Sequence, residues 1–179
     1  MGKNGIIICG YQGIGKSTLA GKNNCIDLES SLFEADGKKP DKWWLIYSKV
    51  AVDLSCQGYT VFTSCHKLVR EGLKIICPSN RLVVVCPDWS LKEAWIKKLE
   101  ERFIKTTSTK DLHAWERARD YFKEDISEIM ENHNYYAIGS MDYKLADIVE
   151  NIKAAMLPDY KSPVTDISRL VLKEKDINI

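Results

Sequence analysis

The sequence predicts an α/β protein in which helices cover both faces of a parallel β-sheet. Short, nearly all-apolar segments alternate along the 179 residues with longer segments of helical periodicity. A glycine-rich loop joins the first apolar segment to the start of a helix. Parallel strands buried on both faces have this continuous apolar character, and their alternation with helices favours right-handed crossovers.

The composition and charge exclude several broad classes of protein. Apolar residues make up 45% of the chain, charged residues 28%, and the formal net charge is +1. This length is enough for one domain with a sizeable core. The charge balance gives no general attraction to nucleic acid or anionic membranes, and no apolar stretch is long enough for a membrane span. We therefore expect a cytoplasmic protein without a membrane partner.

Six cysteines are spread along the chain without a C-x-x-C motif. They are Cys9, Cys25, Cys56, Cys65, Cys77 and Cys86. Several lie in apolar runs, which predicts buried, reduced thiols of an intracellular protein. A zinc site formed by Cys65, His66 and Cys77 is an alternative, although its spacing matches no standard ligand pattern.

Five short apolar segments are the expected strands. They span residues 5–9, 24–28, 59–64, 82–86 and 135–139. After the glycine loop, a short helix is expected to begin at Ser17 and to stop near Asn23. The longer expected helices span residues 41–57, 90–103, 110–132 and 143–156. Gly58 ends the first of these four, Ser90 and Glu93 form a capping box for the second, and Asp142 is the expected N-cap of the last.

The pattern weakens after Leu157, where Pro158 and Pro163 interrupt the chain. Residues 164–172 are expected to form a short docking helix, and residues 173–179 to be loosely held. The expected organisation is therefore one domain over residues 1–157 and a C-terminal tail over residues 158–179.

The glycine loop carries the clearest chemical signal. Residues Gly10-Tyr11-Gln12-Gly13-Ile14-Gly15-Lys16-Ser17 fit the pattern G-x-x-x-x-G-K-[ST], between an apolar strand and a helix. Glycines let backbone N–H groups approach phosphate oxygens, and the helix N-terminus adds partial positive charge. Lys16 would reach the β- and γ-phosphates of ATP, and the Ser17 hydroxyl would ligate Mg²⁺. The alternative is a glycine turn without a ligand. The expected nucleotide-binding residues are Gly10, Gln12, Gly13, Ile14, Gly15, Lys16, Ser17 and Thr18.

With this loop, the chain resembles the P-loop kinases of small molecules, which include nucleoside-monophosphate, shikimate and gluconate kinases. The resemblance covers about residues 5–156 and depends on the loop, on Cys25-Ile26-Asp27-Leu28-Glu29 and on the layout of later elements. It implies a three-layer α/β/α P-loop fold, five parallel strands in the order 2-3-1-4-5, and a helical lid over about residues 90–132. The run Ile-Asp-Leu-Glu-Ser-Ser at 26–31 also resembles a group of phage proteins of unassigned function, whose location would be the host cytoplasm.

In these kinases the second strand ends in a D-x-D-like pair, which Asp27 and Glu29 match. The resemblance implies that Asp27 is catalytic, either by helping to hold Mg²⁺ or by accepting the proton of an acceptor hydroxyl, and that Glu29 binds the acceptor. The alternative is that one of the two acids caps a helix or lies on the surface.

The third strand usually ends in an acid in this family, but here it ends in Thr63 and Ser64. Asp27 would then carry the metal role alone, or the two hydroxyls would hold the water shell of the metal. His66, Lys67 and Arg70 follow this strand, at the start of a helix that lies beside the phosphate loop. We therefore expect them to bind an acceptor anion or to orient the acceptor. The alternative for His66 is a structural or solvated side chain.

The family also has a lid with arginines that close over the transferred phosphoryl group. Arg102 is the expected catalytic lid arginine, ahead of Lys105, Arg117 and Arg119. The long expected helix at 110–132 departs from a short glycine-bearing lid, and is either an enlarged lid or an interface for a partner. Trp43 and Trp44 lie where the family covers the acceptor, so they either stack on a base or pack into the core.

The residues therefore predict an ATP-dependent phosphotransferase with a small acceptor, a nucleoside or nucleoside monophosphate before a hydroxylated metabolite. One alternative is a nucleotide-binding switch or NTPase, although the missing acid after the third strand disfavours it. Another is a kinase that acts on nucleic acid, which the near-zero net charge disfavours. The sequence leaves the oligomeric state open.

Overall fold

The computed structural model describes residues 5–77, 81–157, 160 and 168–173. These residues contain a six-stranded sheet with the strand order β2-β3-β1-β4-β5-β6. The strands are β1 (Ile7–Gly10), β2 (Cys25–Asp27), β3 (Thr60–Ser64), β4 (Leu82–Pro87), β5 (Tyr135–Ile138) and β6 (Leu170–Val171). β1 to β5 are paired in parallel, whereas β6 is antiparallel to β5. The α/β class is confirmed, but the sheet is mixed and has one strand more than the five parallel strands that we expected.

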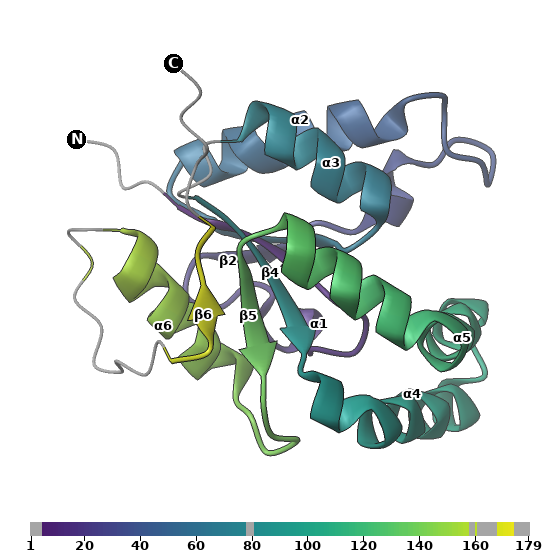
Figure 1. Ribbon diagram of the computed structural model, residues 1–179. Coiled ribbons are helices and arrows are strands. Elements are labelled where there is room, and N and C mark those ends of the chain that lie inside the picture. The colour runs from purple at the N-terminus through teal and green to yellow at the C-terminus, as the bar shows by residue number, and fades with distance from the viewer. Residues whose placement is uncertain (1–4, 78–80, 158–159, 161–167, 174–179) are drawn as a thin grey trace.

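Helices flank this sheet on both sides. They are α1 (Lys16–Leu19), α2 (Trp43–Cys56), α3 (Lys67–Ile76), α4 (Lys92–Thr106), α5 (Thr109–Asn132) and α6 (Leu145–Met156). α2 and α3 pack together on one face, α1 and α6 lie on the other, and α4 and α5 pack side by side near the carboxyl end of β4 (Figure 1). The C-terminal half of α5 reaches back toward α3, so the two helices enclose the end of β3.

The central strands form the middle of the core. Ile7 and Ile8 on β1 and Val83 and Val84 on β4 are fully buried, as expected for strands covered on both faces. Burial of such side chains stabilises each by about 1.5–3 kcal/mol relative to exposure. The same burial fixes the positions of the strand ends at which the polar residues lie.

Tyr47 on α2 holds two of these strand ends together. Its hydroxyl donates to the Leu28 carbonyl at 2.5 Å and accepts from the Ser64 N–H at 2.9 Å. The rings of Phe33 and Trp43 pack edge-on against it. This buried contact sets the spacing between the carboxyl ends of β2 and β3.

Two expected helix caps are wrong. Ser90 does not begin α4; its N–H and hydroxyl both donate to Asp88, which caps a 3₁₀ turn at Trp89–Leu91 that comes before the helix. At α6 the N-cap position is Lys144, and Asp142 lies in the preceding turn. Both differences arise because an extra turn separates the strand from the helix.

The tail differs from the expected docking helix. Leu170 and Val171 form strand β6 beside Tyr136 and Tyr135, and residues 164–167 lie outside the described part of the chain. A strand this short has no periodicity that would reveal it in the sequence. Among the described residues, no helix is both long and apolar enough to cross a membrane.

Candidate functional site

A cleft of about 790 Å³ opens where β1, β2 and β3 end. The chain segments that follow β1 and β3 leave toward opposite faces of the sheet, so a crevice remains between these two neighbouring strands. Ligands of open α/β sheets usually bind at such a position. The cleft is lined by the glycine loop, the residues after β2, the residues from the end of β3 into α3, and α5.

The glycine loop between β1 and α1 is held from the side opposite the cleft. Trp95 Nε1 on α4 donates to the Gln12 carbonyl at 2.9 Å, and the Tyr143 hydroxyl donates to the Gly13 carbonyl at 3.3 Å. The φ angles are 85° at Gly13 and 94° at Gly15, which glycine adopts without strain. The backbone N–H groups of Gln12, Gly13 and Gly15 donate to no described residue. Amides of this kind can bind an anion.

Lys16 and Asp27 line the cleft together, as expected. Lys16 Nζ donates to the Gly10 carbonyl at 3.1 Å. Burial lowers the pKa of Lys16, and the nearby Asp27 carboxylate works in the opposite direction. Burial also raises the pKa of Asp27, whose carboxylate has no hydrogen bond or ion pair among the described residues. A half-buried carboxylate of raised pKa is suited to accept a proton.

The remaining expected loop residues do not all face this cleft. Gly10 and Gln12 line it, whereas Ile14 and Thr18 line a second cavity of about 420 Å³ on the other side of the loop. The Thr18 hydroxyl donates to the Gly15 carbonyl at 2.6 Å. Ser17 lies in the first turn of α1, and its side chain is exposed.

The second cavity lies beside the C-terminal part of the glycine loop and helix α1. Lys98 on α4, Met141 and Tyr143 contribute to its lining. Lys98 Nζ donates to the Tyr143 hydroxyl at 3.0 Å and lies 4.4 Å from the centre of the Trp95 ring. The glycine loop therefore separates two cavities, one lined by acidic and basic side chains, the other by mostly aliphatic side chains with Tyr143 and two lysines.

Glu29 lines the cleft, and its carboxylate is bound by a residue that we did not single out. Lys110 at the start of α5 donates to both carboxylate oxygens of Glu29, at 2.9 and 3.0 Å. This exposed pair joins the segment after β2 to α5 across the mouth of the cleft. Exposed pairs of this kind contribute little to stability, about 0–1 kcal/mol. Here the main effect of the pair is that the two charges cancel at the mouth of the cleft.

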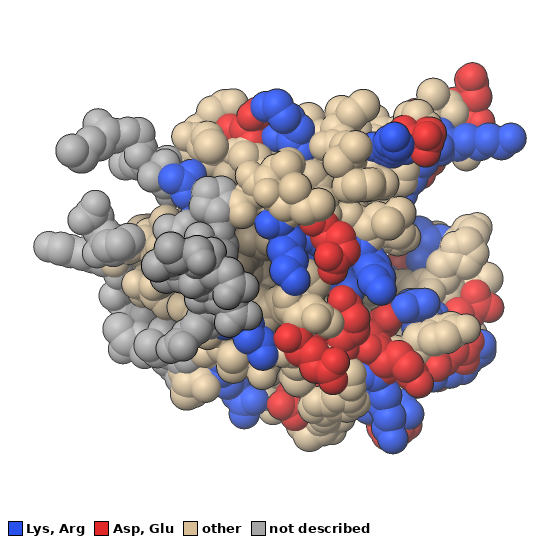
Figure 2. Space-filling model, turned by 45° about the horizontal axis from the view of Figure 1, so that its top comes forward, with Lys and Arg blue, Asp and Glu red and all other residues tan. Residues whose placement is uncertain are grey.

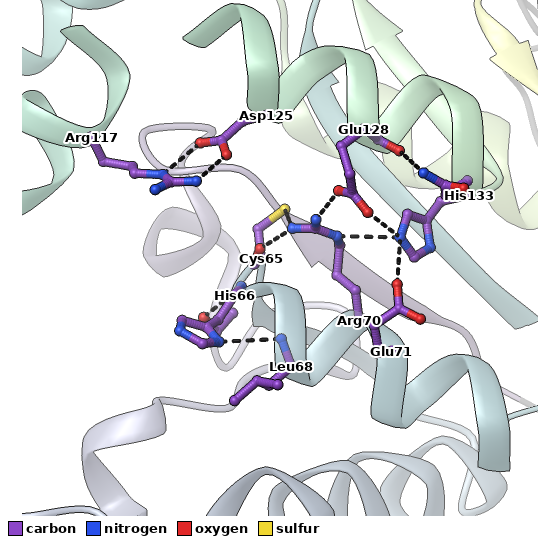
Figure 3. Close-up of polar contacts among 11 residues, drawn as sticks. Cys65, His66, Leu68, Arg70, Glu71, Arg117, Asp125, Glu128 and His133 are labelled. Atoms are coloured by element: carbon purple, nitrogen blue, oxygen red, sulfur yellow. Dashed lines mark hydrogen bonds and ion pairs between the residues drawn. The ribbon is translucent and has the colours of Figure 1, made fainter. Parts of the chain in front are cut away.

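Arg70 also lines the cleft, but its guanidinium is held by other side chains (Figure 3). It donates to the Cys65 carbonyl, to the Glu128 carboxylate and, at 3.4 Å, to His133 Nε2. Glu128 on α5 and His133 after it thereby connect α5 to α3. The sequence led us to expect that Arg70 binds or orients the acceptor; in the structure its guanidinium is part of a buried network at the cleft.

The network includes three side chains close enough to hold a metal ion. Oxygen atoms of Glu71 and Glu128 lie 3.7 and 3.6 Å from His133 Nε2. The same nitrogen accepts the hydrogen bond from Arg70, so the guanidinium already provides the positive charge at this position. We interpret the cluster as an ion-pair network around Arg70.

His66 is the N-cap of α3, with its Nδ1 accepting from the Leu68 N–H at 3.3 Å. Partial burial lowers its pKa, and Lys39 and Arg70 act in the same direction. The imidazole lines the cleft as a neutral group with a structural function. Of the two hydroxyls at the end of β3, Ser64 lines the cleft, while the buried Thr63 donates to Cys9 Sγ at 3.1 Å.

The expected catalytic arginine, Arg102, does not line the cleft. Its guanidinium pairs with Asp111 at 2.7 Å and joins α4 to α5. Arg117 lines the cleft instead, and donates to Asp125 at 2.9 Å through Nε, with a second contact through Nη2 (Figure 3). Non-helical backbone angles at Tyr121 kink α5 between these two residues. The kink lets both halves of α5 face the cleft.

Two other expectations concern residues near α2 and α3. Trp43 and Trp44 are half-buried against the core and do not line the cleft, which favours packing over stacking on a base. No disulfide joins any of the six cysteines, and Cys65 and Cys77 lie at opposite ends of α3, a helix of ten residues and so about 15 Å long. The zinc alternative is therefore excluded.

The sequence did not reveal the cleft residues on α5. They are Lys110, His113, Ala114, Glu124, Asp125 and Glu128. Charges of both signs on a long helix indicate a solvated face, and no local pattern distinguishes the acids that bind arginines in the cleft. Tyr11 was also missed: its buried hydroxyl has no hydrogen-bond partner among the described residues, and its ring packs edge-on against Phe122 of α5.

Comparison of the chain with protein-family models, with curated proteins and with solved structures finds no match.

Proposed function

We propose that the protein is an ATP-dependent phosphotransferase that moves the γ-phosphoryl group of ATP to a small acceptor, a nucleoside or a nucleoside monophosphate. The observation that carries the proposal is the glycine loop between two cavities, with Lys16 and the unpaired Asp27 in one of them. The strand order around β1 supports the assignment to the P-loop fold, because β3 and β4 flank the strand that leads into the loop.

The residues of the loop fit a nucleoside triphosphate and Mg²⁺. Unpartnered backbone N–H groups at Gln12, Gly13 and Gly15 match phosphate oxygens. Ser17 offers the kind of oxygen ligand that Mg²⁺ prefers, and the bound ion would neutralise charge on the β- and γ-phosphates, whereas Asp27 is assigned to the proton of the acceptor. The second cavity, with aliphatic side chains, Met141 and Tyr143 beside Lys98 and Lys144, suits the flat face and polar edge of an aromatic base.

The chain's own residues supply positioning and charge. Lys16 would stabilise negative charge on the transferred group. The acceptor oxygen, a hydroxyl oxygen of a nucleoside or a phosphate oxygen of a monophosphate, forms a bond to the γ-phosphorus. The bond from that phosphorus to the β,γ-bridging oxygen breaks, and its electron pair stays on ADP. Asp27 takes the hydroxyl proton. Arg117 on α5 lines the same cleft, where it is paired with Asp125, whereas the expected lid arginine, Arg102, lies outside it.

A test is ADP release from MgATP, measured with nucleosides, nucleoside monophosphates and hydroxy acids as acceptors. Wild type is compared with Lys16→Ala and with Lys22→Ala, a control that removes an exposed lysine near the same loop. We expect one acceptor to stimulate ADP release in wild type and in Lys22→Ala, and Lys16→Ala to be inactive but folded. Unchanged turnover in Lys16→Ala would contradict the proposal.

A further inference from the structure

The charged side chains that line the cleft indicate which class of acceptor molecule it can bind. Five Lys or Arg side chains and five Asp or Glu side chains line it, so its formal charge is zero with neutral histidines. The basic ones are Lys16, Lys67, Arg70, Lys110 and Arg117, and the acidic ones are Asp27, Glu29, Glu124, Asp125 and Glu128. Figure 2 likewise shows basic and acidic side chains side by side across one face of the molecule, without a continuous basic field.

Three of the five cations are already paired with carboxylates of the same cleft. Arg70 binds Glu128, Lys110 binds Glu29, and Arg117 binds Asp125. The two arginines contact their carboxylates at sites where one or both partners are largely shielded from water. A phosphate on the acceptor would have to displace these carboxylates, which would leave them unpaired and partly desolvated.

The cations that remain do not form a second phosphate site. Among the described residues, Lys16 and Lys67 are the cleft cations without a carboxylate partner. Lys16 belongs to the glycine loop and serves the triphosphate. Lys67 is exposed at the start of α3, and a single solvated lysine gives weak, unspecific attraction to phosphate. A bidentate arginine site for a second phosphate is therefore missing from the described cleft.

The polar groups without partners suit hydroxyl groups. The carboxylates of Asp27 and Glu124 have no partner among the described residues, and carboxylates accept hydrogen bonds from hydroxyl donors. The Tyr11 hydroxyl and the Gln12 side-chain nitrogen are buried without a partner and belong to residues that line the cleft. The Tyr11 hydroxyl and the Gln12 side-chain amide are neutral, so they add no charge to the cleft.

From this pairing of charges we infer that the acceptor is an uncharged molecule with hydroxyl groups, such as a nucleoside, and not its monophosphate. The inference rests on the proposed phosphotransferase function and narrows it to one acceptor class. The hydroxyl oxygen takes the γ-phosphoryl group, its proton goes to Asp27, and ADP leaves with the electron pair of the broken P–O bond.

The test compares each of the common ribo- and deoxynucleosides with its own 5′-monophosphate, together with a short oligonucleotide that has a free 5′-hydroxyl. Two readouts are used: ADP release from MgATP, and binding of the acceptor alone by calorimetry. We expect kcat/KM for an uncharged nucleoside to exceed that for its monophosphate by about tenfold or more, since a phosphate must displace a paired carboxylate. Calorimetry should show the same order of affinity.

Two variants test the role of the paired carboxylates. Asp125→Asn releases Arg117 and Glu29→Gln releases Lys110; the second pair is exposed, so this variant should fold even if the first does not. Each should shift the preference toward the monophosphate, by about five- to tenfold for the partly shielded Asp125 pair. Glu131→Gln is the matched control, because it removes an exposed acid of α5 outside the cleft. It should leave the preference unchanged.

The outcomes separate this inference from the proposed function. If a monophosphate or the oligonucleotide is the preferred acceptor, or if no uncharged compound stimulates ADP release, the inference is wrong. In either case, ATP binding that depends on Lys16 would leave the phosphotransferase proposal standing. Loss of that dependence would overturn the proposed function itself.

Discussion

Acidification should destabilise the protein through His133, which joins the end of α5 to α3. The side chain is 3% exposed, and its Nε2 accepts a hydrogen bond from Arg70 Nε at 3.4 Å. This contact requires a neutral imidazole. Burial, with Arg70 and Lys74 in the same direction, lowers the pKa of His133 from 6.5 to about 4, although Glu71 opposes the shift.

The sign of the effect follows from the protons bound in each state. Between about pH 6.5 and pH 4 the unfolded chain binds a proton at His133 that the folded protein does not. Stability therefore falls as the pH decreases through this window and is unaffected by this group above it. With these two pKa values, linkage gives a loss of about 2 kcal/mol between pH 7 and pH 5.

Urea denaturation at pH 7 and pH 5 measures this loss. His133→Gln keeps a hydrogen-bond acceptor for Arg70 but does not titrate, so its stability should fall by about 2 kcal/mol less than that of wild type over the same interval. His113→Gln, which removes an exposed histidine of α5, should behave like wild type. His66, whose pKa is also lowered, is present in all three proteins and cancels in the comparison. Equal losses in wild type and His133→Gln would refute the reasoning.

Three further substitutions test the cleft. Gly13→Ala should lower the free energy of unfolding in urea by about 1–2 kcal/mol, because φ is 85° at this residue and a Cβ would lie 2.9 Å from Leu99 Cδ2. The same substitution should weaken ATP binding. Asp27→Asn should lower kcat by about 100-fold or more with little change in ATP affinity, and equal losses in both would indicate a structural role. Arg102→Ala should leave kcat within about threefold, because Arg102 lies outside the cleft and is paired with Asp111. A loss of about tenfold or more would support the original expectation that Arg102 is the catalytic lid arginine.

The parts of the site that the sequence predicted depend on local chemistry. A glycine that requires positive φ, a lysine after it and an acid at a strand end are recognisable because each is defined by its immediate neighbours. Gly13, Lys16 and Asp27 lie at the cleft or in its loop for this reason. The short apolar strands were predictable in the same way, because burial on both faces leaves a continuous apolar run.

The rest of the site depends on contacts between residues far apart in the chain. Arg70 was expected to bind or orient the acceptor, but its guanidinium contacts Glu128, which lies 58 residues later in the chain. Arg117 faces the cleft because α5 bends at Tyr121, where the sequence has neither proline nor glycine to signal a kink. The sequence around a charged residue is the same whether its side chain is solvated or paired across a cleft. Only its position in the folded structure distinguishes the two.

The most direct test of the central claim, that the glycine loop binds ATP, is calorimetric titration of MgATP into wild type, Lys16→Ala and Lys22→Ala. We expect saturable one-to-one binding to wild type and to Lys22→Ala. Hydrogen bonds to charged groups contribute about 1.5–3 kcal/mol, so Lys16→Ala should weaken binding by about 10- to 150-fold. Equal affinity in all three proteins, or no binding to wild type, would contradict the account.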